Sequence, residues 1–344
     1  MKKLFILPLL MAFGCGSSDP VSVSTAVLDS HTSSLLQAIS FVNENTAWVS
    51  GHQATFCRTL DRGKTWEVFA HPSDTLQFRD IHAFSDDQVL LMSAGPGASS
   101  RIMLYDHGIR QFQELYVMPH AEGFLNTVEF WDDSNGLAFG DSFNGELFVL
   151  QTKNGGQSWK RIDPEKLPAA GEGEGGFAAS GTCITTKAGG EAFIGTGANG
   201  HSRILHTSDY GESWEELKSP LIKGEIAGIF SIRMAGDMGL IAGGDLNQPD
   251  EYTENIGMST DGGKSWQLSG FPNIKGTLYG SSIIPIGSTY FMAVCGPKGL
   301  DYTTTMGEKW VTLDTANYWA VGLHDSGTGY AVGTEGRIIR ITLN

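Results

Sequence analysis

The sequence predicts an all-β protein built as a single seven-bladed β-propeller, and three observations carry this prediction. Glycine supplies 45 of the 344 residues without a collagen-like period, which favours many tight turns between short strands. One octapeptide that ends in tryptophan recurs along the chain. The segments that contain it follow one another at about 44 residues, the length of one four-stranded propeller blade.

The first residues resemble the signal peptide of bacterial lipoproteins. Lys2 and Lys3 precede an apolar stretch, 4–13, that is too short to cross a bilayer as a mature helix. Small residues then lead to Cys15, as in the lipobox whose cysteine is acylated and becomes the new N-terminus. The predicted segments are a signal peptide at 1–14, a lipid-anchored tether at 15–25 and the propeller at 26–344.

The alternative is an ordinary cleaved signal in which Cys15 is incidental. Both interpretations predict an exported protein. Lipidation at Cys15 further predicts anchoring to a bacterial membrane, on the periplasmic side or at the cell surface.

The octapeptide follows the pattern Ser/Thr-x-Asp-x-Gly-x-x-Trp and is predicted to form hairpin turns. Its aspartate can accept backbone N–H bonds within the turn, and its glycine can adopt a positive φ. The tryptophan begins the next strand and packs against neighbouring layers. One copy, Thr303 to Trp310, has Thr305 in place of Asp. The residues with this structural role are Asp61, Trp66, Asn154, Trp159, Asp209, Trp214, Asp261, Trp266 and Trp310.

Each octapeptide closes a unit with one order of elements: a strand, a polar turn, a second strand, a loop, a third strand, the octapeptide turn and a fourth strand. The last unit stops one strand short. The stretch 21–29, ahead of the first unit, can supply that strand and close the ring, which removes exposed sheet edges. The predicted units are 35–70, 77–116, 125–163, 177–218, 226–270, 277–313 and 317–344.

Charge and cysteine content narrow the function classes. The formal net charge is -15, which argues against non-specific nucleic-acid binding, because phosphate contacts need a basic face. No stretch after residue 20 approaches the ~18 apolar residues of a membrane helix. Cys57, Cys183 and Cys295 lie in apolar runs without metal-site or disulfide spacing. We expect them to be small buried core residues, and one disulfide between two of them remains open.

The octapeptide resembles the Asp-box, or BNR repeat, of sialidases, some glucan hydrolases, sortilin-type receptors and photosystem II assembly-factor propellers. The whole unit, with Thr46-Ala-Trp48 in its second strand, looks most like the assembly-factor type. It looks closer still to uncharacterised bacterial lipoproteins of that type, sometimes labelled oxidoreductases or glycosyl hydrolases. The strings similar to theirs include Phe78-Arg-Asp-Ile81, Phe139-Gly-Asp141, Phe177-Ala-Ala-Ser-Gly-Thr182 and Gly243-Gly-Asp245.

This resemblance implies the propeller fold and a role in binding or assembly. The chain has no dinucleotide fingerprint and no haem or iron–sulfur cysteine spacing to support a redox activity. Sialidase chemistry, as the resemblance implies it, needs an arginine triad and an Arg-Ile-Pro string. Arg-Ile-Pro is absent, and only Arg79 and Arg233 stand near the starts of first strands.

The octapeptide turns are predicted to mark one face of the ring, and a ligand is expected at the opposite face, which carries more variable loops. Those loops bring polar residues toward one side of the channel mouth: Asp141, Glu174, Ser180, Ser231 and Asp245. Paired carboxylates there suit general acid–base work on a glycoside, or a Ca²⁺ ion. The alternative is that they cap turns and that the serines let inner strands pack closely. No other cofactor is expected.

Two further candidates complete the site. Arg79 is a candidate ligand-binding residue, with a buried ion pair to Asp80 as the alternative. Tyr302 and Trp319 are candidates for an aromatic platform at the rim, or for packing between blades.

Two functions remain open. The first is a non-catalytic, lipid-anchored scaffold that binds an envelope protein or glycan through the face opposite the octapeptide turns, as a monomer and without nucleic acid. The second is a carbohydrate-active enzyme, sialidase-like or glycosyl hydrolase-like, with its acidic residues at the channel mouth.

Overall fold

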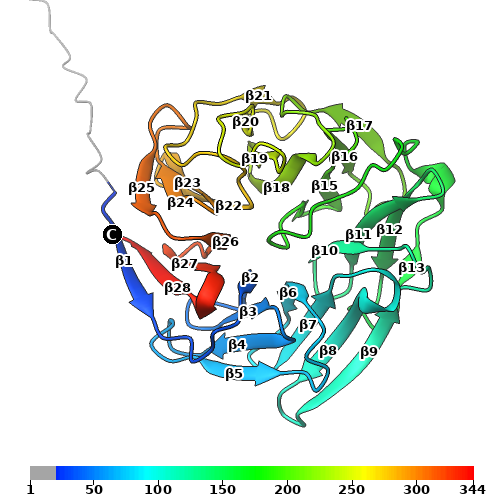
Figure 1. Cartoon of the computed structure of the whole chain (residues 1–344), viewed down its shortest axis with the longest axis horizontal. Coiled ribbons are helices and arrows are strands. Elements are labelled where there is room, and N and C mark those ends of the chain that lie inside the picture. The colour runs from blue at the N-terminus through cyan, green and yellow to red at the C-terminus, as the bar shows by residue number, and fades with distance from the viewer. Residues whose placement is uncertain (1–20) are drawn as a thin grey trace, which may run out of the picture.

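The computed structural model describes residues 21–344 and shows seven four-stranded antiparallel sheets arranged around a central axis (Figure 1). The predicted all-β, seven-bladed propeller is therefore confirmed. Within residues 21–344 the helical content is limited to three short 3-10 turns, η1 (Gly97–Ser99), η2 (Pro164–Lys166) and η3 (Thr334–Gly336). No helix in the described part of the chain is long and apolar enough to cross a membrane. The predicted signal peptide and Cys15 lie outside the described residues.

Each blade is a meander whose strands run in chain order from the axis to the rim. Blade 1 contains β2 (Leu36–Phe41), β3 (Ala47–Gly51), β4 (Thr55–Thr59) and β5 (Glu67–Ala70). Blade 2 contains β6 (Phe78–Ala83), β7 (Gln88–Ser93), β8 (Arg101–Asp106) and β9 (Gln111–Val117). Blade 3 contains β10 (Leu125–Phe130), β11 (Gly136–Phe143), β12 (Glu146–Thr152) and β13 (Lys160–Arg161).

The next three blades follow the same order. Blade 4 contains β14 (Ile184–Lys187), β15 (Glu191–Gly195), β16 (Arg203–Thr207) and β17 (Glu215–Lys218). Blade 5 contains β18 (Ala227–Ala235), β19 (Met238–Asp245), β20 (Ile256–Ser259) and β21 (Gln267–Leu268). Blade 6 contains β22 (Gly280–Ile286), β23 (Thr289–Gly296), β24 (Gly299–Thr303) and β25 (Val311–Asp314).

Blade 7 joins the two ends of the described chain. Its sheet has β26 (Tyr318–Leu323), β27 (Thr328–Gly333) and β28 (Ile338–Leu343), with β1 (Val23–Leu28) added at the rim. β1 runs antiparallel to β28, with Val23 opposite Leu343 and Leu28 opposite Ile338. The predicted closure by an N-terminal strand is thus observed, and the strand begins inside the segment that was predicted as tether.

The core lies between blades. Second strands such as β7 and β19 are buried on both faces, because each blade is packed between two others; this explains their nearly continuous apolar runs. Seven apolar clusters fill the seven contacts between neighbouring blades. At the contact between blades 1 and 7, Trp66 packs edge-on against Tyr330 with ring centroids 5.3 Å apart.

The octapeptide turns have the geometry that their residues predict. In the first one, Oδ1 of Asp61 accepts the Thr65 N–H at 2.9 Å, and the Thr59 hydroxyl accepts the Gly63 N–H at 2.8 Å. Gly63 has φ +74°. Each turn joins a third strand to a fourth strand, so the turns mark one face of the ring. We call this the box face, and the opposite face, which carries the loops into each first strand, the top face.

The three described cysteines are buried and free. Cys57, Cys183 and Cys295 lie in three different clusters between blades. They are therefore small core residues, and the disulfide left open by the sequence is not formed.

Candidate functional site

Blade 4 departs from the predicted unit at its start. The sequence predicted a first strand from 177, but β14 begins at Ile184. The segment 175–183, here called the central loop, instead enters the axis of the ring, where Figure 1 shows a green loop near the centre. A strand would keep this segment beside its own blade, whereas the loop contacts the inner strands of most other blades.

Hydrogen bonds hold the central loop to five blades. The carbonyl of Ala178 accepts from Gln37 at 2.9 Å and from Arg79 at 3.4 Å, which join blades 1 and 2. Ser180 donates to the Tyr279 carbonyl of blade 6 at 2.7 Å. The remaining bonds come from Thr127 of blade 3 to the Gly181 carbonyl, and from Thr182 to Ser231 of blade 5. The loop therefore closes the axial channel and separates its two ends.

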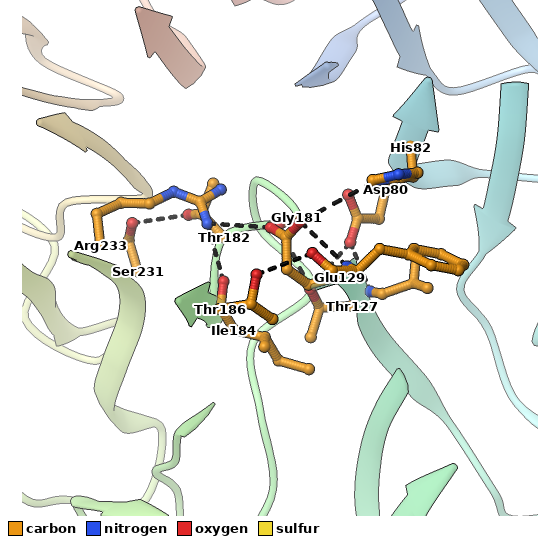
Figure 2. A network of polar contacts seen from close by, with 12 residues as sticks. Asp80, His82, Thr127, Glu129, Gly181, Thr182, Ile184, Thr186, Ser231 and Arg233 are labelled. Carbon is orange, nitrogen blue, oxygen red and sulfur yellow. Dashed lines mark hydrogen bonds and ion pairs between the residues drawn. The ribbon is translucent and has the colours of Figure 1, made fainter. Parts of the chain in front are cut away.

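Asp80 and Gly181 fix the middle of the loop, as Figure 2 shows. Asp80 is buried, and its carboxyl oxygens accept the Ile81 N–H at 2.7 Å, the Val128 N–H at 2.7 Å and the Thr127 hydroxyl at 2.9 Å. Gly181 has φ +67°, and a Cβ there would lie 2.1 Å from Oδ1 of Asp80. Burial raises the pKa of Asp80 to about 8. Because these partners bond Asp80, the ion pair to Arg79 considered from the sequence is not formed.

A charged pair, Arg233 and Glu129, lies on the box-face side of the contact between Asp80 and Gly181. Arg233 donates to the Ile184 carbonyl at 2.8 Å and lies 3.4 Å from the Glu129 carboxylate (Figure 2). Burial raises the pKa of Glu129, although Arg233 opposes the shift. His82 packs on Phe130 at 4.4 Å, and burial lowers its pKa to about 4. Arg233 thus links the inner strands of blades 3 and 4 through Glu129 and Ile184.

The top face has a hollow above the central loop, with a volume of about 290 Å³. We call it the central depression. It draws on blades 2, 3, 5, 6 and 7 and on the central loop. Its lining residues are Arg79, Phe124, Asn126, Asp141, Gly176, Phe177, Ala178, Ala179, Phe230, Leu246, Tyr279 and Trp319.

Aromatic rings form a continuous row along one side of the central depression. Phe177 of the central loop stacks on Phe230 with centroids 3.7 Å apart and an interplanar angle of 8°. Phe230 continues to Tyr279 at 6.1 Å, and Tyr279 to Trp319 at 4.7 Å. The row crosses from the loop over blades 5, 6 and 7. Such a surface suits apolar or aromatic groups of a ligand.

Two charged side chains face the same hollow from blades 2 and 3. Arg79 bonds only neutral oxygens, with Nε and Nη2 on the Gln77 amide at 3.0 and 2.6 Å. Asp141 accepts from the Asn126 amide at 2.7 Å and from the Gly176 N–H at 3.3 Å. Burial raises the pKa of Asp141 and lowers the pKa of Arg79. The sequence candidates Arg79 and Asp141 are therefore brought together in one pocket.

Two predicted acidic candidates, Glu174 and Asp245, do not line this pocket, and each is bonded by other groups of the chain. Glu174 is fully buried and bonds Arg203 at 2.7 and 2.8 Å and Thr196 at 2.7 Å. Burial alone would raise its pKa, but these hydrogen bonds hold the pKa of Glu174 below its usual value. Asp245 accepts the Asn247 N–H at 2.9 Å and so caps its own turn. Asp245 fits the turn-capping alternative, and Glu174 also caps its turn, because its Oε2 accepts the Gly171 N–H at 2.8 Å.

The predicted serines lie deeper, in a chain of buried hydroxyls. Ser180 and Thr182 lie 2.5 Å apart, Thr182 donates to Ser231 at 2.7 Å, and Ser231 lies 2.7 Å from Ser281. None of these bonds involves a histidine, so the chain is a packing feature. Tyr302 stacks on Phe291 at 4.9 Å within blade 6 and lies away from Trp319's position in the central depression. The Tyr302–Trp319 platform is thus replaced by the row ending at Trp319.

Sequence reasoning missed the aromatic row and Asn126. Phe177 belongs to the string Phe177-Ala-Ala-Ser-Gly-Thr182, which the predicted unit 177–218 places in a first strand. Phe230 and Trp319 lie within the first halves of the first strands β18 and β26, and Tyr279 lies one residue before the first strand β22. An aligned comparison of those starts offers the signal that would have found them.

Other cavities carry less specific chemistry. A groove of about 840 Å³ between blades 3 and 4 contains Lys153 and Lys166, and both are paired with Glu212. Among residues 21–344, no three His, Cys, Asp or Glu side chains gather as a metal site requires. The possible Ca²⁺ ion stays a prediction.

Comparisons with known proteins agree on the fold. No family model and no curated protein matches the chain. Solved propellers align over most of its length. YCF48 bound to a D1 peptide aligns with TM-score 0.62 and 14% identity, covering 94% of this chain and 95% of the other. The WD40 propeller domain of Doa1 gives 0.60 and 10%, covering 92% and 95%. Streptogramin B lyase gives 0.63 and 14%, covering 94% and 98%.

These identities show a common fold and no more. One of the similar propellers is solved with a peptide, and another is named as a lyase. The fold therefore accommodates both binding and catalysis, and the function must be argued from the site.

Proposed function

We propose that this protein is a non-catalytic binding scaffold, exported and lipid-anchored, that captures a protein partner through its top face. The observation that carries the proposal is the central depression, where an aromatic row lies beside Arg79 and Asp141, two charges with only neutral partners. Aromatic and arginine side chains in a central hollow are typical of the residues that dominate protein–protein binding. The peptide complex of a similar propeller supports the same kind of role.

The alternative glycosidase needs two carboxyl groups flanking one sugar bond. The central depression has one, Asp141, because Glu174 is bonded to Arg203 and Asp245 caps its own turn. This distribution favours binding over glycoside hydrolysis. A panel of glycoside substrates, tested with the purified protein and with its Asp141→Asn variant, checks it: hydrolysis that the variant loses would favour the enzyme.

The test of the scaffold is a crosslinked pull-down of the tagged, lipidated chain from its native envelope. Leu246 lines the central depression and is 37% exposed, so Leu246→Glu places a charge there without disturbing the core. Leu268, 47% exposed in β21, is the matched control. We expect one stoichiometric partner that is captured by the wild type and by Leu268→Glu and is lost with Leu246→Glu.

Acidic residues at the rim of the top face allow a second test of the scaffold. Glu172, Asp250 and Glu251 are exposed on the top face, and Glu308 is exposed on the box face. Reversal of the three rim charges to lysine should weaken capture, whereas Glu308→Lys should not. A partner retained equally by every variant would overturn the proposal.

A further inference from the structure

The two charges in the central depression are not balanced within the described chain. Arg79 bonds the Gln77 amide and the Ala178 carbonyl, and Asp141 bonds an amide and a backbone N–H. Neither side chain joins an ion pair among residues 21–344. A half-buried charge whose partners are neutral has lost hydration without gaining an opposite charge. Each is therefore complementary to a ligand group of the opposite sign.

The distance between the charges is spanned by three residues of the central loop. Gly176 donates its N–H to Asp141, and Ala178 offers its carbonyl to Arg79. Three residues cover at most roughly 10 Å, the span of a fully extended chain. A ligand that reaches both charges along the surface of the loop is thus a few residues long, which agrees with a hollow of about 290 Å³.

The aromatic row supplies the third contact. Phe177, next to Gly176 and Ala178, starts the row on the same stretch of loop. An apolar side chain that lies against this row sits beside both charged groups. The hollow then combines one cationic, one anionic and one apolar contact.

We propose that the central depression binds a short internal segment of the partner protein in which an acidic and a basic residue flank an apolar one. The acidic side chain bonds Arg79, the basic side chain bonds Asp141, and the apolar side chain packs on the row from Phe177 to Trp319. This inference rests on the proposed function and specifies the chemistry of its partner.

The experiment measures the affinity of tripeptides capped at both ends, so that only their side chains carry charge. Glu-Phe-Lys and Lys-Phe-Glu test the two directions, and Gln-Phe-Lys, Glu-Phe-Gln and Gln-Phe-Gln remove one charge or both. The protein variants are Arg79→Gln and Asp141→Asn. Arg110→Gln and Asp86→Asn, exposed changes in blade 2, are the controls.

We expect one doubly charged peptide to bind best. Arg79→Gln should weaken it about tenfold, a typical value for one charge-assisted hydrogen bond, and should leave Gln-Phe-Lys unchanged. Asp141→Asn should weaken it similarly and leave Glu-Phe-Gln unchanged. Equal affinity for all five peptides, or variants that weaken all of them uniformly, would overturn the inference.

Two more outcomes keep the inference separate from the proposed function. Uncapped Gly-Phe-Gly that binds as tightly as the best capped peptide would show that chain termini supply the charges, and would overturn the assignment to an internal segment. An envelope partner that is lost with Leu246→Glu but retained by both Arg79→Gln and Asp141→Asn would leave the scaffold standing and refute the charge recognition.

Discussion

Gly181→Ala tests whether the contact between the central loop and Asp80 stabilises the fold. Gly181 has φ +67°, and the added Cβ would lie 2.1 Å from Oδ1 of Asp80. Ordinary carbon–oxygen contacts are more than 1 Å longer than this, so the loop or the carboxyl group must move. Asp80 is held there by three hydrogen bonds of 2.7 to 2.9 Å. The substitution therefore disturbs a buried polar group as well as the backbone.

The expected cost has two parts. A positive φ costs an alanine about 1 kcal/mol. Disturbing a buried hydrogen-bonded carboxyl group costs about 1–3 kcal/mol more. The free energy of unfolding should fall by about 2–4 kcal/mol in total. Gly145→Ala isolates the first part, because Gly145 also has a positive φ, +77°, and a Cβ there meets nothing within 4 Å.

Urea unfolding followed by tryptophan fluorescence measures both variants against the wild type. We expect Gly145→Ala to lose about 1 kcal/mol and Gly181→Ala to lose at least 1 kcal/mol more. Equal losses, within about 0.5 kcal/mol, would show that the loop has room to retreat from Asp80 and would refute a tight, stabilising contact between Gly181 and Asp80.

Three other outcomes are expected. Burial raises the pKa of Asp80 to about 8 in the folded chain. The contribution of the protonated carboxyl group to stability is therefore present below pH ~4 and is lost as the pH rises through 8. The difference in unfolding free energy between the wild type and Asp80→Asn should decline across this window, by at most about 1.4 kcal/mol per pH unit. Hydrogen bonds from Ser265 lower the pKa of Asp261 to about 2. At pH 7, Asp261→Ala should therefore lower the free energy of unfolding by about 0.5–2 kcal/mol, as loss of a similar capping bond does. Urea unfolding at lower pH should show a progressively smaller loss as the pH falls toward 2. In the Cys15→Ser chain, a thiol reagent should label no cysteine before unfolding and three after it, because burial raises the pKa values of Cys57, Cys183 and Cys295; labelling of any of them in the native protein would contradict their placement in the core.

The fold could be predicted from the sequence because each blade repeats the same local physics. The turn at Asp61 and Gly63 is held by hydrogen bonds between residues four positions apart, so its geometry can be derived from one copy and checked on the others. Ring closure was also predictable. The last unit lacks a fourth strand, and the stretch 21–29 at the start of the chain forms a strand that belongs to no other unit, so the two are expected to pair. Blade 4 escaped this reasoning. The segment 177–183 has the apolar and small residues of a strand, and only its partners in other blades keep it at the axis.

The site could be predicted only in part. The face that carries the central depression followed from the order of the strands, and Arg79 and Asp141 were among the candidates that meet there. Glu174 and Asp245 were indistinguishable from them in the sequence, because an acidic residue after glycine looks the same whether it caps a turn or faces a pocket. What separates these cases is a partner far along the chain, such as Arg203 for Glu174. The aromatic row has the same origin, since its rings come from four separate elements.

The pairing of β1 with β28 has a consequence for how the molecule is made. The two strands come from opposite ends of the described chain, roughly three hundred residues apart, so this contact carries the largest loop-closure entropy in the molecule. During synthesis β1 emerges first and cannot pair until β28 has been made, so until then blade 7 lacks its outer strand. Because the predicted tether, 15–25, overlaps the start of β1, the pairing that completes blade 7 also fixes the last residues of that segment to the ring. A chain truncated within β28 should keep six blades in sequence but leave β1 without a partner, which exposes it to proteases and to pairing with other chains.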